Sequence, residues 1–233
     1  MNGADETLPS VNAKKARLAP IFPLGWYWIA PAALLDAGLS IAAFRRPSPA
    51  LVALAALAAL AALFLIWFFR DPEREPSAEA LWQLQGKSPI LSPADGKIAD
   101  IAPINGKIRI GIFLSPLDVH VQWAPFEGKV VKITRKGLDF FPAYDPRASD
   151  LNVSVTIDVD HPRLGSCAIR QITGILVRRI LTQSKEGASL KFGQRLGMIL
   201  LGSRVELELP SHAQILVKTG DHVYGGQTII ACY

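Results

Sequence analysis

Three short segments of this sequence carry side chains that are suited to nucleophilic catalysis. Ser203 follows Gly202, just before the alternating apolar and polar residues 205–209. His120 follows an Asp-Val pair, and Asp95 precedes a glycine. A hydroxyl, an imidazole and a carboxylate are the groups of a nucleophile–base–acid triad. Taken alone, however, Gly-Ser and Asp-Gly pairs are typical of tight turns, and a lone histidine is usually structural.

A serine hydrolase is one enzyme that Ser203, His120 and Asp95 would suit, but the sequence lacks the usual Gly-x-Ser-x-Gly elbow around the serine. Metal chemistry has little support. The sequence contains neither His-x-x-x-His nor Cys-x-x-Cys, and residues 158–161 hold only a loose group of two aspartates and a histidine. A glycine-rich phosphate-binding loop is also absent. We therefore expect no metal site.

Four longer motifs follow one another along the chain. They are Phe68-Phe69-Arg70-Asp71-Pro72-Glu73-Arg74, Ser92-Pro93-Ala94-Asp95-Gly96, Phe113-Leu114-Ser115-Pro116-Leu117-Asp118-Val119-His120-Val121 and Leu201-Gly202-Ser203-Arg204. Together they resemble the phosphatidylserine decarboxylases, in particular the short membrane-anchored bacterial form. The resemblance extends from about Phe64 to the C-terminus.

The resemblance implies a proenzyme that cuts itself between Gly202 and Ser203. Residues 1–202 would form a large chain and residues 203–233 a small chain, whose first residue, Ser203, becomes a pyruvoyl cofactor. Decarboxylation of an amino acid needs such a carbonyl electron sink, because no natural side chain accepts the electrons well. Glycine before the serine suits self-cleavage, because it has no Cβ and leaves its carbonyl open to attack. The implied activity is the conversion of phosphatidylserine to phosphatidylethanolamine in phospholipid biosynthesis.

The resemblance also implies roles for a histidine and an aspartate. His120 would be the base in self-cleavage and the acid that reprotonates the substrate α-carbon. Asp95 would be the carboxylate that orients it. The long-chain form of the family has a second histidine three residues further on, to which self-cleavage is assigned. Trp123 occupies that position here, so we expect His120 to serve in both reactions.

Other polar residues have less defined roles. Arg204 matches the Gly-Ser-Arg pattern of the short form, and it would either bind a substrate phosphate or carboxylate or be an exposed cation on a strand. The segment around Asn152 departs from the acidic-polar run of the short form, which leaves room for a different substrate preference. The remaining histidines match no motif and lie in turn-like contexts, so we expect them at the surface; they are His161, His212 and His222.

The N-terminal third predicts attachment to a membrane. Residues 50–69 are an uninterrupted apolar run, about the 20 residues that cross a bilayer as a helix. The run ends in an aromatic belt at residues 67–69, followed by Arg70. Residues 23–44 are also apolar but are interrupted by Pro31 and Asp36. We expect one transmembrane helix or a helical hairpin over 23–70, and no cleaved signal peptide.

Charge predicts the orientation of the hairpin. The polar tail, residues 1–22, carries three cations, and further cations follow the second apolar run. Cytoplasmic loops are enriched in Lys and Arg, so we expect the tail and the catalytic domain to face the cytoplasm. The net charge of +5 also suits an anionic phospholipid surface. Lys/Arg blocks interleaved with aromatic residues are absent, which argues against nucleic-acid binding. Two cysteines without metal or disulfide spacing fit a reducing compartment.

The rest of the chain predicts a mainly β domain. After a polar linker, 71–86, residues 87–233 form short alternating runs separated by Gly, Pro, Asn and Asp, without a βαβ rhythm. We expect a compact antiparallel barrel-like or sandwich-like domain. Residues 176–181 are the one segment of it with helical character. Residues 213–230 resemble the two-stranded hairpin of biotinyl or lipoyl carriers, without their modified lysine.

Two further alternatives stay open at this level. One is a membrane-anchored β-rich binding or adaptor domain, which would neither cleave itself nor contain a ketone. The other keeps the chemistry and changes the substrate to another serine-containing or amino-acid-containing lipid.

Overall fold

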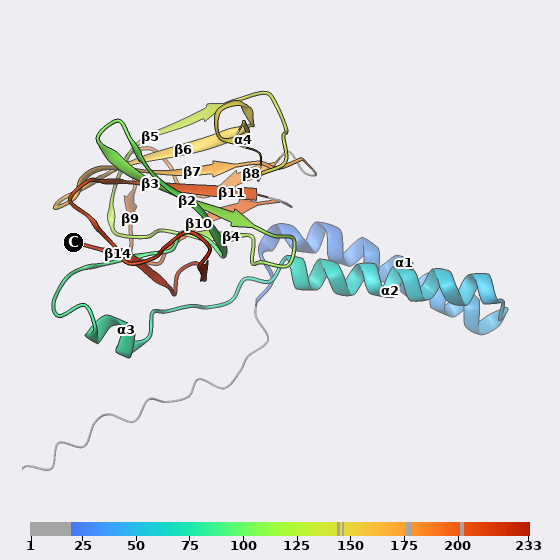
Figure 1. Cartoon of the computed structure of the whole chain (residues 1–233). Helices are drawn as coiled ribbons and strands as arrows, with labels where there is room; N and C mark the ends of the chain where they lie inside the picture. Colours follow the sequence, from blue (N-terminus) through green and yellow to red (C-terminus); the bar gives the residue numbers. More distant parts are fainter. Residues whose placement is uncertain (1–19, 144, 146, 176–178, 201–202) are drawn as a thin grey trace, which may run out of the picture.

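The computed structural model describes residues 20–143, 145, 147–175, 179–200 and 203–233. Gly202 and most of the polar tail predicted for residues 1–22 therefore lie outside the described residues. Within them the chain forms an antiparallel helical hairpin followed by a β domain (Figure 1). The mainly β class and the two N-terminal apolar helices are as the sequence predicts.

The hairpin consists of α1 (Trp26–Arg45), preceded by the short 3-10 helix η1 (Pro23–Gly25), and α2 (Pro49–Phe68). Both helices are long and apolar enough to cross a bilayer, and most of their side chains are exposed. Ser48 caps α2 by accepting a hydrogen bond from the Leu51 N–H at 3.2 Å. Pro31 lies inside α1 and does not end it, so the residues that interrupt the apolar run do not interrupt the helix.

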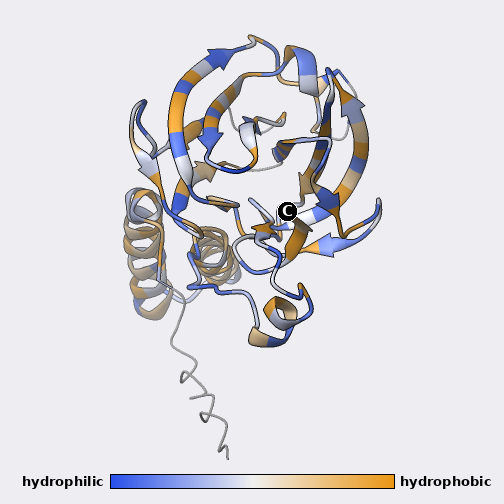
Figure 2. Ribbon diagram, turned by 90° about the vertical axis from the view of Figure 1, so that its left-hand side faces the viewer, coloured by the Kyte–Doolittle hydropathy of each residue, from blue (hydrophilic) through white to orange (hydrophobic). Residues whose placement is uncertain are grey.

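One large antiparallel sheet makes up most of the domain. Its strands lie in the order β13-β2-β3-β11-β7-β6-β5-β9. They are β2 (Gly96–Ile104), β3 (Lys107–Leu114), β5 (Gly128–Lys136), β6 (Ser154–His161), β7 (Gly165–Ile172), β9 (Ser189–Leu190), β11 (Ser203–Pro210) and β13 (His222–Val223). The sheet curls into a half-barrel around the apolar core (Figure 2).

Two three-stranded sheets and two short helices complete the domain. The first sheet is β1-β14-β12 (Pro89–Leu91, Ile229–Cys232, Gln214–Ile215), and the second is β4-β10-β8 (Val121–Trp123, Arg195–Ile199, Ile180–Thr182). The helices are α3 (Ala78–Trp82), within the predicted linker, and α4 (Ala148–Leu151).

Two local predictions are wrong. A helix was expected over 176–181. The described part of that segment instead enters β8, because its residues pair with β10. The tail is not a hairpin of two paired strands. Instead, β12 pairs with β14 and β13 pairs with β2, so the tail bridges two different sheets.

Side-chain alternation divides the residues of β11 between two environments. Val205, Leu207 and Leu209 are fully buried in the main core inside the curled sheet. Arg204 and Glu206 alternate with them along the strand and therefore point to the opposite face. Because β11 pairs with β3 on one side and β7 on the other, the segment that begins at Ser203 is central to the fold.

A second apolar cluster joins the hairpin to the domain. The hairpin contributes Phe22, Ile29, Phe68 and Phe69, and the domain contributes Val119, Val121, Trp123, Met198 and Leu200. Two backbone hydrogen bonds join the two ends of the hairpin to each other, from the Phe22 N–H to the Phe69 carbonyl and from the Asp71 N–H to the Pro20 carbonyl. The helices are thus packed against residues that flank His120 and precede Ser203.

Candidate active site

Ser203 is the first residue of β11 and is fully buried. Strand pairing places it opposite Leu114, the last residue of β3. Its Oγ has no hydrogen-bond partner among the described residues. A buried hydroxyl without a partner costs stability, so it is a candidate for a functional group rather than a packing one.

His120 lies between β3 and β4 and is fully buried. Its Nδ1 is 2.9 Å from the carbonyl oxygen of Asp118. Because a carbonyl only accepts hydrogen bonds, Nδ1 must carry the proton, and Nε2 then has a free lone pair. No described residue is bonded to Nε2. This is the tautomer that a general base needs.

The surroundings of His120 keep the ring neutral. The ring of Phe68, at the end of α2, lies 4.5 Å away between centroids. Burial lowers the His120 pKa to about 4, against the opposing effect of the Asp118 carbonyl hydrogen bond. The end of the apolar helix α2 therefore covers one side of this base.

Two neighbouring chain segments bring His120 and Ser203 to the same end of the sheets. The Ile199 N–H donates to the His120 carbonyl at 3.2 Å, and Met198 pairs with Val121. Ser203 follows Ile199 by four residues. The connection from β10 to β11 thus begins beside the histidine and ends at the serine. Gly202, the residue on the other side of the expected cleavage point, lies outside the described residues.

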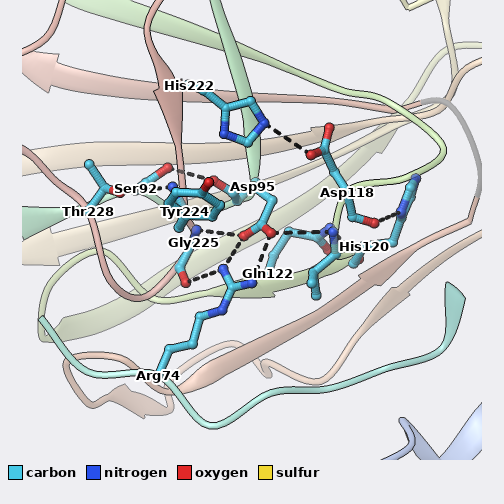
Figure 3. Close-up of polar contacts among 12 residues, drawn as sticks. Arg74, Ser92, Asp95, Asp118, His120, Gln122, His222, Tyr224, Gly225 and Thr228 are labelled. Atoms are coloured by element: carbon cyan, nitrogen blue, oxygen red, sulfur yellow. Dashed lines mark hydrogen bonds and ion pairs between the residues drawn. The ribbon is translucent and has the colours of Figure 1, made fainter. Parts of the chain in front are cut away.

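Asp95 is buried, but it does not hold the His120 ring directly (Figure 3). Both of its oxygens accept hydrogen bonds from the Arg74 guanidinium. It also accepts from the Gly225 N–H at 2.8 Å and from the Val119 N–H at 3.4 Å. The direct carboxylate–imidazole contact expected from the sequence is replaced by the Asp118 carbonyl. Asp95 reaches the histidine through the neighbouring peptide.

Arg74 is the residue of this site whose role the sequence analysis missed. Its guanidinium lies 5.2 Å from the Trp123 ring and 5.7 Å from the Tyr224 ring, and it donates to the Gly225 carbonyl at 3.2 Å. Arg74 stands at the end of the motif that follows α2. The motif was visible in the sequence, but its pairing with Asp95, 21 residues further along the chain, was not. Trp123, in the place of a second histidine, is a buried packing residue here.

The prediction that the remaining histidines lie at the surface holds for His212 and His222 and is wrong for His161. His222 is exposed, but its Nε2 lies 3.2 Å from Asp118 Oδ1, beside the site (Figure 3). His161 is fully enclosed. Its Nδ1 accepts the backbone N–H of Leu164 at 3.0 Å, and its Nε2 lies 2.9 Å from the hydroxyl of Tyr233. His161 therefore fixes the C-terminal residue against the β6–β7 turn.

Arg204 is neither an exposed cation nor open to a ligand. It is buried and bonded to Glu206 at 2.8 Å and to Asp100 at 2.5 Å. The second residue of the expected small chain is thus fixed to the neighbouring strands. Asn152 is also buried, and its amide bonds the backbone of Phe141 and Thr173, which is a structural role. Among the described residues no group of three or more His, Cys, Asp or Glu is placed to hold a metal.

Comparison with known proteins adds an independent finding. The family model described as phosphatidylserine decarboxylase matches residues 61–231. The phosphatidylserine decarboxylase proenzyme of Pelodictyon phaeoclathratiforme is 36% identical over 206 residues, which cover 86% of this chain and 93% of the relative. That of Streptomyces avermitilis is 37% identical over 204 residues, covering 87% and 89%. That of Chlorobium limicola is 33% identical over 215 residues, covering 90% and 98%.

Proposed function

The chain belongs to the phosphatidylserine decarboxylase family, and on that premise we propose that it is a self-cleaving, pyruvoyl-dependent carboxy-lyase that converts phosphatidylserine to phosphatidylethanolamine. One observation of the site supports this most directly. The Oγ of Ser203 and the Nε2 of His120 are both buried polar atoms without a described partner. Their segments meet at one end of the sheets, as a nucleophile and its base require.

Maturation would use the chain's own atoms. Ser203 Oγ attacks the Gly202 carbonyl, and the amide between the two residues becomes an ester. His120 Nε2 then removes the Ser203 α-proton, and β-elimination breaks the ester and leaves Gly202 with a free carboxylate. The resulting dehydroalanine hydrolyses to a pyruvoyl group and ammonia. Relatives that are named proenzymes support a processed product. The neutral His120 supports the role of base, because its lone pair is available at neutral pH.

The buried start of β11 fits a pyruvoyl group at residue 203. The group supplies an electron sink for the electrons left on the substrate α-carbon when carbon dioxide departs. His120 would then deliver a proton to that carbon. The apolar wall formed by Phe68 and Trp123 excludes water from the site, which strengthens electrostatic interactions inside it. Asp95, held by Arg74, would position the loop that carries His120.

We place the enzyme in the cell membrane. The two apolar helices within 23–70 support one hairpin anchor, with the domain 87–233 and the tail 1–22 on the cytoplasmic side. Residues 71–86 would be the linker between anchor and domain. A lipid substrate explains an anchor that brings the domain to the bilayer, and anionic phospholipid is the expected surface partner.

Intact-mass analysis of the purified protein, with and without borohydride reduction, tests the proposal. We expect two chains, 1–202 and 203–233, and a mass increase on reduction of the small chain alone. Ser203→Ala should give one uncut chain. If the wild-type chain stays intact and carries no reducible group, the pyruvoyl proposal is wrong. A serine-hydrolase probe then separates the hydrolase alternative from a binding domain.

The substrate is tested separately with the processed enzyme. Vesicles containing phosphatidylserine should release carbon dioxide and gain phosphatidylethanolamine. Release from another amino-acid-containing lipid in preference to phosphatidylserine would retain the reaction and change its substrate.

A further inference from the structure

We propose that the β domain itself lies on the phospholipid bilayer, through exposed apolar side chains at the end of the large sheet that carries Ser203. The proposal adds a second membrane contact to the hairpin. It rests on the membrane anchor proposed above, and on the proposed reaction only for its catalytic consequence. The four side chains that would enter the bilayer surface are here called the apolar rim; they are Leu117, Leu138, Leu151 and Ile175.

Strand register shows that these residues share one end of the sheet. Ser203 pairs with Leu114, Arg204 with Ile172, and Ser154 with both Ile172 and Lys136. The connections that leave these strand ends are therefore neighbours. They run from β3 to β4, from β5 to β6 and from β7 to β8, and they contain all four residues of the apolar rim.

The apolar rim is exposed without a described cover. The exposed fractions are 68% for Leu117, 88% for Leu138, 43% for Leu151 and 56% for Ile175. Large apolar side chains that gather at one end of a soluble surface usually mark an interaction site. The exposed cations Lys136 and Arg179 accompany them, but so do the acidic residues Asp139 and Asp150. The apolar side chains therefore support the contact more strongly than the charges do.

The hairpin identifies the occupant as a bilayer. It leaves the domain from the same end (Figure 1). Arg70, just after α2, donates to the Leu117 carbonyl at 2.7 Å, and its guanidinium lies 4.0 Å from the Trp67 ring. Trp and Arg at the end of a membrane helix mark the level of the headgroups. Leu117 is tied to that level, so the apolar rim continues the surface where α2 leaves the membrane.

Placed in this way, the start of β11 and the His120 loop face the headgroups. A phospholipid would reach the site from the bilayer without leaving it, which accounts for the contact between a membrane helix and the His120 ring. Catalysis on vesicles would then depend on the apolar rim, while self-cleavage, which is internal to the chain, would not.

Fluorescence quenching at single positions tests the contact. An environment-sensitive probe is attached to cysteine in the variants Leu138→Cys, Ile175→Cys and Leu216→Cys of the full chain, in vesicles of phosphatidylcholine and phosphatidylglycerol. The native cysteines are both buried, which limits background labelling. Leu216 is the matched control, because it is 44% exposed and its N–H donates to the Ile230 carbonyl of β14, which lies on the side of the domain away from the hairpin (Figure 1).

We expect spin-labelled lipids to quench the probes at 138 and 175, and aqueous iodide to quench the probe at 216. Equal iodide quenching at all three positions would overturn the proposal. This result does not depend on catalysis, so a failure of the proposed function would be recognised separately from the chain masses of the same samples.

A charge variant tests the catalytic consequence. Leu138→Glu should raise KM for phosphatidylserine in vesicles about tenfold or more, the loss expected when one leucine side chain no longer enters the bilayer. Leu216→Glu should not change KM, and both variants should cleave themselves as the wild type does. An unchanged KM in Leu138→Glu, with both chains formed, would contradict the proposed contact.

Discussion

At the scale of single residues, the site depends on which polar atoms have partners and which do not. Asp95 is saturated by Arg74 and two backbone N–H groups, whereas Ser203 Oγ and His120 Nε2 have no described partner. Buried polar groups are normally bonded, so two unpartnered atoms on segments that meet at one end of the sheets support the proposed roles of nucleophile and base. We infer that Asp95 positions the His120 loop instead of polarising the imidazole.

Phe68→Ala should raise the pKa of His120 towards its ordinary value of 6.5, because water would replace the ring that buries it. In the wild type the folded-state pKa of about 4 lies below the unfolded value. His120 therefore contributes stability above about pH 6.5, which is lost as the pH falls towards 4. The variant should show a smaller loss over this window. Histidine NMR titration in detergent measures the pKa directly.

Phe64→Ala is the control for Phe68→Ala. Phe64 stacks on Phe68 at 6.1 Å but is 40% exposed on the surface of α2. Its removal should leave the His120 titration unchanged. An identical titration in Phe68→Ala and wild type would show that the helix does not control the protonation of this histidine.

Arg74→Gln should destabilise the domain by about 3–5 kcal/mol, because it leaves the buried Asp95 carboxylate without its cation. Thermal unfolding of the detergent-solubilised protein measures the loss. Arg147→Gln removes another Arg–Asp pair, but the Arg147 side chain is 62% exposed, so we expect little change. Equal effects of the two variants would mean that Arg74 does not support the site in the way described.

At the scale of elements, close backbone approaches fix the segments that carry the site. Gly96 follows Asp95 and has a φ of +140°, and a Cβ there would lie 2.1 Å from the Phe113 carbonyl oxygen of β3. Such pairs usually form turns, but here Gly96 begins β2 and lies in close contact with the backbone of β3. Strand pairing of β2 with β3 and of β13 with β2 then brings Asp95 close to the tail.

Gly96→Ala should cost about 3 kcal/mol or more, from the positive φ and from the contact with β3 together. Self-cleavage should slow in the same variant, because Asp95 would move. Gly106→Ala is the matched control. Gly106 has a φ of +76° but open space where a Cβ would stand, so the cost should be only about 1 kcal/mol. Denaturant unfolding compares the two, and similar losses would refute the role given to backbone contact.

At the scale of the whole molecule, the expected small chain contributes strands to two of the three described sheets, the large sheet and β1-β14-β12, and none to β4-β10-β8. β11 lies between β3 and β7, β13 pairs with β2, and β12 and β14 form a sheet with β1. Its last residue, Tyr233, is bonded to His161 and to the backbone of Ser88. Cutting one peptide bond at its start would remove none of these interactions.

We therefore predict that the two chains stay together after cleavage. They should elute as one species from size-exclusion chromatography in mild detergent and separate only in denaturant. Ser203→Ala, which stays a single chain, gives the reference elution position. Release of residues 203–233 under native conditions would contradict this arrangement.

The sequence by itself determined the family, the β class of the domain and the two apolar helices. These depend on local properties: the length of an apolar run, the alternation of strands and the order of short motifs. It also picked out Ser203, His120 and Asp95 as the chemically suited residues, through motifs that surround each of them.

Only the tertiary structure decided how these residues are held. The pairing of Arg74 with Asp95, the Phe68 ring on His120 and the burial of Arg204 and His161 join segments far apart in the chain. Local patterns carry no information on such contacts, which arise when strands and helices pack. For the same reason the predicted helix at 176–181 became, where described, a strand, since its partner β10 is supplied by the fold.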